Sequence, residues 1–538
     1  MSHPALITFA LIALTAIGAI MARRLRMPAS IFLVIFGIAA SFLPDLPRIP
    51  IEPDVVLQVL LPPLLYIAGV GMSWRGFKRE FGDIFLLAVG CVLATAAAVA
   101  VTVHGLLGWP LALGFVLGAI VAPPDAVAPI AITEGLALPE RIVTVLEGEG
   151  LVNDATALIL FSFAVTAVER GSFSLPAAMG LFIVVAIAGI AWGLVVGWAT
   201  LRLRRNLGDP QIELTIALLT PYIAFWPLQA LGGSGVLAAV AAGLYVSANG
   251  AQSIPPATRL QGYFFWRFVV YVTEGAIFVI TGLQAWPIIA SLRKDSWQKL
   301  PLAIGIVILA VVAVRLIWVL GLTRFPRDLI RKRLGRRPPP WQHDIFIGFT
   351  GIRGVVSLAA ALSIPFMANG APFPQRDLVL IITFAVILAT LVGQGLSLPL
   401  VVRKLGLDAE GRRELAAAKD REIRARVAGV EAALAELSGR GPEGVSAGPM
   451  RVLKNRQRDR RDTLISALKR VDGQYVDWLK VQLSLIDAER QKIAELYDND
   501  AITDEARRRI ERELDLEDAR ARHAYDSSLP QRNDDLIP

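Results

Sequence analysis

Acidic side chains stand inside two consecutive apolar stretches of this 538-residue sequence. Asp125 lies in the first stretch, and Asp154 lies in the second together with Glu147 and Glu149. A charged side chain at bilayer depth is costly, so such residues usually face water or a partner and serve a function. A carboxylate in that setting is stabilised by either a bound proton or a bound cation. The pattern therefore predicts that these acids form a functional site inside the membrane.

The backbone around Asp125 is expected to be broken. Pro123, Pro124 and Pro129 surround this aspartate, and proline removes an amide donor and disfavours helix at the preceding residue. Unwound backbone at mid-membrane exposes carbonyls that can coordinate a cation beside the N-terminus of the following half-helix. The simpler alternative is a proline kink that tolerates an incidental aspartate.

A second break is expected where Gly351 and Gly354 flank Arg353 inside another apolar stretch. This arrangement repeats the first one with the opposite charge. Interrupted helices at corresponding positions in two halves of a transporter point to an inverted repeat and a central binding site.

Helical spacing separates the roles of the acids in the second stretch. Steps of three and four place Glu147 and Asp154 on one face, while Glu149 and Asn153 fall on the adjacent stripe. We expect Asp154 to face an aqueous cavity beside Asp125, and we expect Arg353 to be the buried counter-ion of Glu149. Glu147 could equally be a solvated residue at the cavity mouth. Asn153 could be an ordinary interhelical hydrogen-bonding residue.

These residues belong to an integral membrane domain. The chain is 54% apolar with a mean hydropathy of +0.55. Charged residues make up 46 of the first 400 positions but 54 of the last 138. At about 20 apolar residues per crossing, thirteen spans are expected, with twelve as the alternative. They lie at about 4–22, 28–44, 54–72, 83–104, 110–133, 140–168, 174–201, 210–231, 233–249, 262–291, 300–321, 343–368 and 377–402.

Loop charge sets the expected orientation. Lys and Arg concentrate in the loops after odd-numbered spans, so the N-terminus is predicted outside and the tail in the cytoplasm. The predicted domains are a transmembrane domain at 1–403 and a charged helical cytoplasmic domain at 404–538. The net charge of +8 then reflects cytoplasmic loops rather than nucleic-acid binding.

Several kinds of chemistry are excluded or lack support. The single cysteine, Cys91, cannot form an intrachain disulfide, and the four histidines form no ligand cluster in the sequence. No convincing Gly-rich nucleotide loop is present, and no cofactor is expected.

Four ordered strings carry a resemblance to a known family. They are Pro124-Asp-Ala-Val-Ala128, Gly148-Glu-Gly-Leu-Val-Asn-Asp-Ala-Thr-Ala-Leu158, Phe349-Thr-Gly-Ile-Arg-Gly-Val-Val-Ser-Leu358 and Gln394-Gly-Leu-Ser-Leu-Pro399. Together they resemble the bacterial branch of the cation/proton antiporter-1 family, which includes the sodium/proton exchangers of animals. The resemblance covers about residues 1–405, and the stretch 504–516 of the tail resembles the same branch more weakly.

The resemblance implies an all-α inverted-repeat antiporter fold of about thirteen helices, with two crossed broken helices, a mobile core domain and a static domain that dimerises. It implies electroneutral sodium/proton exchange by a homodimer in the bacterial inner membrane. By motif, Asp154 would bind the cation and the proton, with Asn153 and Asp125 supporting it, and Glu149 and Arg353 would form a structural ion pair. Glu274 and Arg315 match charged family positions, where pairing between them is plausible.

Three positions depart from a common pattern of the family. Pro124 and Gly150 stand where many relatives have Thr and Ser, and Ile67 stands near the place of an acid in the third span. Water or backbone carbonyls could replace the lost ligands, and the ion preference could differ. Exchange of potassium for protons, a cation channel or sensor on the same scaffold, and, more weakly, an intramembrane aspartyl hydrolase are the alternatives.

Overall fold

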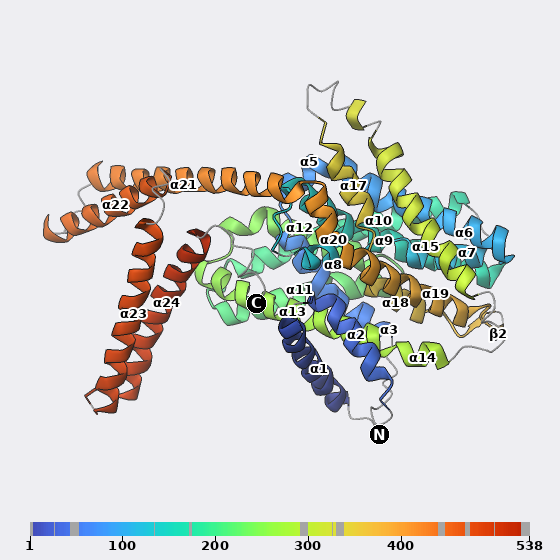
Figure 1. Ribbon diagram of the computed structural model, residues 1–538, viewed down its shortest axis with the longest axis horizontal. Helices are drawn as coiled ribbons and strands as arrows, with labels where there is room; N and C mark the ends of the chain where they lie inside the picture. Colours follow the sequence, from blue (N-terminus) through green and yellow to red (C-terminus); the bar gives the residue numbers. More distant parts are fainter. Residues whose placement is uncertain are drawn as a thin grey trace. The chain divides into compact units, whose positions relative to one another are not determined.

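The computed structural model describes residues 4–25, 27–43, 53–133, 135–171, 175–290, 300–324, 327–329, 338–368, 370–439, 447–468, 474–499 and 501–528. The chain divides into two compact units, residues 1–410 and residues 411–538. Both units are helical (Figure 1), and the described strands are two short segments that pair as a hairpin, β1 (Met367–Ala368) and β2 (Ala371–Pro372). The prediction of an all-α fold is confirmed.

Helices account for nearly all of the described part of the first unit. They are α1 (Pro4–Leu25), α2 (Ala29–Ser41), α3 (Pro53–Val55), α4 (Leu61–Gly71), α5 (Trp74–Phe85), α6 (Val92–Leu107), α7 (Leu111–Val121), α8 (Val127–Ile132), α9 (Glu140–Arg170), α10 (Leu175–Arg204), α11 (Pro210–Ala230), α12 (Gly235–Asn249), α13 (Pro256–Leu283), α14 (Ala285–Ala290), α15 (Leu300–Ile317), α17 (Trp341–Phe349), α18 (Val355–Leu362), α19 (Arg376–Leu388) and α20 (Gly395–Lys404). Wider π-helical turns join α3 to α4, α5 to α6 and α19 to α20 without interrupting the helical path, at Val56–Leu60, Leu86–Cys91 and Ala389–Gln394.

In the part of the chain that the structure describes, each predicted span contains one helix, a joined series of helices or a broken pair, and the number of membrane crossings stays a prediction. Among the described residues, six helices are long and apolar enough to cross a membrane: Trp74–Leu107, Glu140–Arg170, Ala178–Arg204, Pro256–Ala290, Leu300–Leu329 and Arg376–Lys404. Four shorter apolar helices accompany them: Ala29–Ser41, Val56–Gly71, Leu111–Val121 and Gly235–Asn249.

Both predicted helix breaks are present. The first interrupts the helical path between α7 and α8 at residues 122–126, where Pro123 and Pro124 cannot donate to the helix ladder. The second lies between α17 and α18 at residues 350–354, which include Gly351 and Gly354. The predicted twelfth span runs to 368, but α18 already ends at Leu362 and the hairpin follows.

Small residues let the helices of this unit approach closely. A Cβ on Gly69 of α4 would lie 3.0 Å from the Val240 carbonyl oxygen of α12. A Cβ on Gly114 of α7 would lie 2.8 Å from the Cα of Ala100 in α6. In lipid, where tails are as apolar as the helices, such close packing is a main source of helix association. These contacts hold α4 and α7 in place beside the site.

The second unit contains most of α21 (Leu407–Gly439), then α22 (Ala447–Leu468), α23 (Gln474–Asp498) and α24 (Asp504–Ser528). Helices α23 and α24 lie side by side (Figure 1) around the buried side chains Ile486, Leu514 and Ala521. Leu483 packs against this cluster, and Leu479 of the same helix is also buried. Thr503 caps α24, since its hydroxyl accepts from the Ala506 amide at 3.2 Å.

Candidate functional site

A cavity of about 600 Å³ lies among the broken helices, α9, α4 and α13. Its lining is mostly apolar, and four carboxylates reach it: Asp125, Glu147, Asp154 and Glu274. Asp125 belongs to the first break, Glu147 and Asp154 belong to α9, and Glu274 belongs to α13. An apolar cavity with a few convergent ionisable groups is the usual form of a small-ligand site. The cavity therefore brings together four of the acids that the sequence singled out.

The two breaks contact each other at Asp125. The Asp125 amide donates to the Ile352 carbonyl at 2.7 Å, which joins the α7–α8 break to the α17–α18 break. The Asp125 carboxylate accepts from the Val127 amide at 2.8 Å, which satisfies one free donor at the start of α8. Its other oxygen lies against Gly354, where any Cβ would overlap it. Asp125 thus sits where the two interrupted helices cross.

Helix α9 presents the two faces that its spacing predicts. Glu147, Gly150 and Asp154 line the cavity. Glu149 is 1% exposed and Asn153 is 0% exposed, so both point into protein rather than into the cavity.

Asn153 and Gly150 fit α9 against the first break. The Asn153 amide group donates to the Pro124 carbonyl at 2.6 Å, while its Oδ1 is buried without a hydrogen-bond partner among the described residues. A Cβ on Gly150 would lie 2.5 Å from the Cβ of Ala126, closer than real Cβ atoms approach. Glycine at 150 leaves room for Ala126, and the Pro124 carbonyl of the unwound segment accepts from Asn153. Both features allow α9 to pack on that segment. A direct role of Asn153 in ion binding stays a prediction.

The predicted pair between Glu149 and Arg353 is wrong. Arg315 of α15 makes a two-pronged ion pair with Glu149 instead, through bonds of 2.5 and 2.9 Å from its two terminal nitrogens. Both side chains are 2% exposed. A fork of this kind matches carboxylate geometry and compensates two buried charges at once. Because Arg315 is engaged here, the suggested pairing of Arg315 with Glu274 is not what the structure shows.

Arg353 donates hydrogen bonds to backbone carbonyls at the two helix breaks. Its guanidinium donates to the Val121 carbonyl at 2.9 Å, to the Ala122 carbonyl at 3.5 Å and to the Gly351 carbonyl. Its own amide donates to the Thr390 hydroxyl at 3.0 Å. The carbonyls at the C-terminal end of a helix lack intrahelical donors and carry partial negative charge, so a cation stabilises them. The breaks thus pair a cation with the carbonyls at the end of α7 and an anion with the amides at the start of α8.

The three positions that depart from the family pattern differ in whether they line the cavity. Pro124 and Gly150 both line the cavity, whereas Ile67 is absent from its lining. Leu64, Leu65 and Ala68 are the α4 residues that face the cavity near that position.

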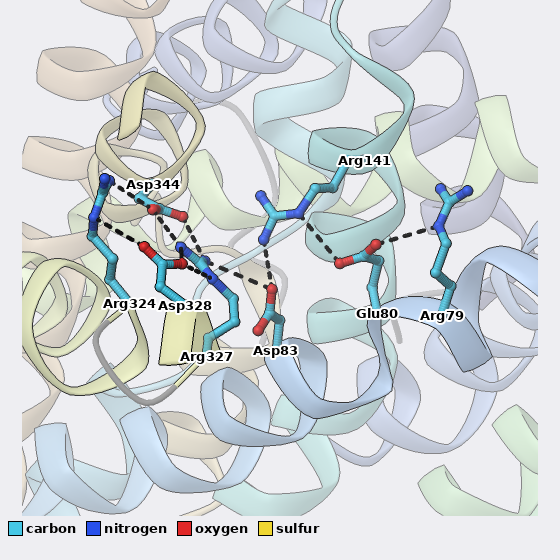
Figure 2. Close-up of polar contacts among 8 residues, drawn as sticks. All are labelled: Arg79, Glu80, Asp83, Arg141, Arg324, Arg327, Asp328 and Asp344. Carbon is cyan, nitrogen blue, oxygen red and sulfur yellow. Dashed lines mark hydrogen bonds and ion pairs between the residues drawn. The ribbon is translucent and has the colours of Figure 1, made fainter. Parts of the chain in front are cut away.

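A group of charges that the sequence did not single out joins four helical segments (Figure 2). Arg141, at the start of α9, bonds Glu80 at 3.2 Å and Asp83 at 2.5 Å, both on α5. Arg327 lies 3.7 Å from Asp83 and donates to both oxygens of Asp344, on α17, at 2.7 Å. In the sequence these residues look like ordinary loop charges at helix ends. In the structure they are largely buried and paired. They join α9, which carries Asp154, to α5, and they join α17, which precedes the second break, to the segment of Arg327.

No group of three or more His, Cys, Asp or Glu side chains with metal-binding geometry occurs among the described residues. The ionisable side chains that line the cavity are carboxylates, among them Asp125 and Asp154, and their oxygens are hard ligands.

Known proteins resemble this chain over most of its length. A family model described as the transmembrane sodium/hydrogen exchanger matches residues 10–404. An uncharacterised sodium/proton exchanger of Mycobacterium tuberculosis is 32% identical over 95% of this chain and 94% of its own length. A sodium, potassium, lithium and rubidium/proton antiporter of Bacillus subtilis is 31% identical over 74% of this chain and 61% of its own.

A solved structure has the same fold. The sodium proton antiporter MjNhaP1 of Methanocaldococcus jannaschii aligns with a TM-score of 0.60 at 18% identity, covering 74% of this chain and 96% of that protein.

Proposed function

The chain belongs to the family of transmembrane sodium/hydrogen exchangers, and we propose that Asp154 is the carboxylate at which it exchanges sodium for protons. The observation that carries this proposal is the position of Asp154 in the cavity beside Asp125, at the crossing of two broken helices. A carboxylate at that depth is stabilised by a proton or by a cation. Each substrate therefore displaces the other.

Asp125 supports the site from the break. One of its oxygens already accepts from the Val127 amide, which leaves lone pairs for a cation or a water in the cavity. No hydrogen bond to the Asp154 carboxylate occurs among the described residues, so this carboxylate is the freer of the two to exchange a proton for a cation. Glu274 reaches the same cavity from α13 and adds a further carboxylate to its lining.

The described conformation is open toward the cytoplasm in this proposal. Thr133, Leu136 and Leu138 of the α8–α9 connection line the cavity. That connection follows the fifth predicted span and so lies on the side assigned to the cytoplasm by loop charge. The N-terminus is then outside and the tail inside. The assembly that fits is a homodimer in the bacterial inner membrane acting by alternating access, as a secondary active transporter without a cofactor.

Exchange of one cation for one proton fits this site. Asn153 occupies the position before Asp154 and cannot titrate, and it holds the Pro124 carbonyl instead. When either a proton or a monovalent cation neutralises Asp154, the loaded site moves across the membrane without net charge. A membrane potential therefore neither drives nor slows the cycle. The ion itself is proposed to be sodium. Potassium is the alternative, because the Bacillus relative is named for several alkali cations.

Reconstituted liposomes test these proposals. A sodium gradient should drive proton movement, and clamping the potential with valinomycin should leave the rate unchanged. A rate that follows the clamped potential would mean that a second group titrates, Asp125 first. Current through the protein without coupled proton movement would support the channel alternative. Repeating the assay with potassium and lithium would assign the ion.

A further inference from the structure

The first turns of α5 have two chemically distinct sides. Glu80 and Asp83 face inward and bond Arg141. On the outer side, Trp74 is 37% exposed and Phe81 is 51% exposed. Aromatic residues recur every three or four positions of this helix, and their rings contact one another.

The ring contacts form a continuous ladder. Successive centroid distances are 6.1 Å from Trp74 to Phe77, 5.8 Å from Phe77 to Phe81 and 6.0 Å from Phe81 to Phe85. Phe77 is buried at 7% exposed, whereas Trp74, Phe81 and Phe85, which is 50% exposed, present their rings at the surface. Large exposed rings are unfavourable in water and suit the boundary between lipid tails and headgroups.

Basic side chains accompany the ladder. Arg75, Lys78 and Arg79 are all exposed, and the Lys78 ammonium lies 4.7 Å from the centroid of the Trp74 ring. The acids of the same helix do not cancel this charge at the surface, because Glu80 is 3% exposed and already bonded to Arg141. Arg79 also contacts Glu80 at 3.3 Å, whereas Arg75 and Lys78 have no ion pair among the described residues.

The length of the helix sets the depth of these residues. The helical path from Trp74 to Leu107 contains 34 residues, about 51 Å at 1.5 Å per residue. Residues 84–103 contain no charged side chain and span about 30 Å, the thickness of the hydrocarbon core. Residues 74–83 therefore lie at the level of the lipid headgroups. Loop charge assigns this end to the cytoplasmic leaflet, whose surface is negative.

We propose that the outer face of α5, formed by Trp74, Arg75, Lys78 and Phe81, binds the headgroup of an anionic phospholipid. The phosphate is held by Arg75 and Lys78, and the acyl chains lie along the aromatic ladder. The site adjoins the charge network of Figure 2, since Arg79 contacts Glu80. Its existence does not depend on which ion the protein exchanges.

Photolabelling in vesicles tests the site directly. The full-length protein is placed in phosphatidylcholine vesicles containing either photoreactive phosphatidylglycerol or photoreactive phosphatidylcholine, and the labelled peptides are mapped. Labelling of residues 74–85 should favour phosphatidylglycerol in the wild-type protein. The double variant Arg75→Gln/Lys78→Gln should need roughly 30-fold more phosphatidylglycerol for the same labelling, at about 1 kcal/mol for each basic residue.

The matched control is Arg23→Gln/Arg24→Gln, which removes two exposed basic residues at the end of another helix on the same predicted side. It should leave labelling of 74–85 unchanged. Equal labelling by the two lipids in the wild-type protein, or an unaltered lipid preference in the Arg75/Lys78 variant, would overturn the proposal. Melting curves in detergent check that each variant is folded.

Discussion

The ion pair between Glu149 and Arg315 predicts a specific pattern of energetic coupling. The two bonds of 2.5 and 2.9 Å join side chains that are each 2% exposed. Removing one partner leaves the other charge buried, which typically costs about 3–5 kcal/mol.

A double-mutant cycle measures this coupling. Glu149→Gln and Arg315→Met should each lower the unfolding free energy by about 3–5 kcal/mol in mixed micelles. The double variant should lose less than the sum of the two, by about 3 kcal/mol. A parallel cycle between Glu149 and Arg353 should show a coupling below about 1 kcal/mol, because Arg353 bonds backbone carbonyls. Strong coupling to Arg353 and none to Arg315 would refute the assignment.

Two glycines offer sharper tests of the packing at the site. Gly354→Ala should abolish most exchange because the new methyl group displaces the Asp125 carboxylate, whereas Gly393→Ala, with no atom within 4 Å of the added Cβ, should transport normally; equal rates for the two variants would contradict the contact. Gly150→Ser should slow sodium-driven proton flux because its Cβ meets that of Ala126 at 2.5 Å, and adding Ala126→Gly should restore the flux. If the second substitution gives no recovery, α9 does not pack on the break in this way.

The sequence predicts the parts of this site that depend on local rules. Prolines beside Asp125 and glycines beside Arg353 predict two breaks, because each residue type acts on its own backbone. Helical spacing predicts which α9 side chains share a face, so the positions of Glu147 and Asp154 in the cavity follow from the chain alone.

The partner of Glu149 could not be predicted in the same way. Spacing shows that Glu149 points away from the cavity, but two buried arginines were available, and the choice depends on which helix covers that face. The role of Arg353 could have been predicted from the break, since unwound backbone leaves carbonyls that need hydrogen-bond donors. The bonds from Arg141 to Asp83 and from Arg327 to Asp344 could not be predicted from the sequence either. They join different helical segments, 58 and 17 positions apart, and nothing local distinguishes these residues from solvated charges.

The central claim is that sodium and protons compete for Asp154, and the pH dependence of sodium affinity tests it most directly. Initial uptake of radiolabelled sodium is measured in liposomes with equal pH on both sides, for the wild-type protein and for Asp154→Asn. In the acidic range, each unit decrease in pH should raise the half-saturating sodium concentration by up to about tenfold, since each cation displaces one proton. The maximal rate should persist, and Asp154→Asn should fold normally but transport nothing. A half-saturating concentration that does not change with pH, or near-normal uptake by Asp154→Asn, would contradict the account.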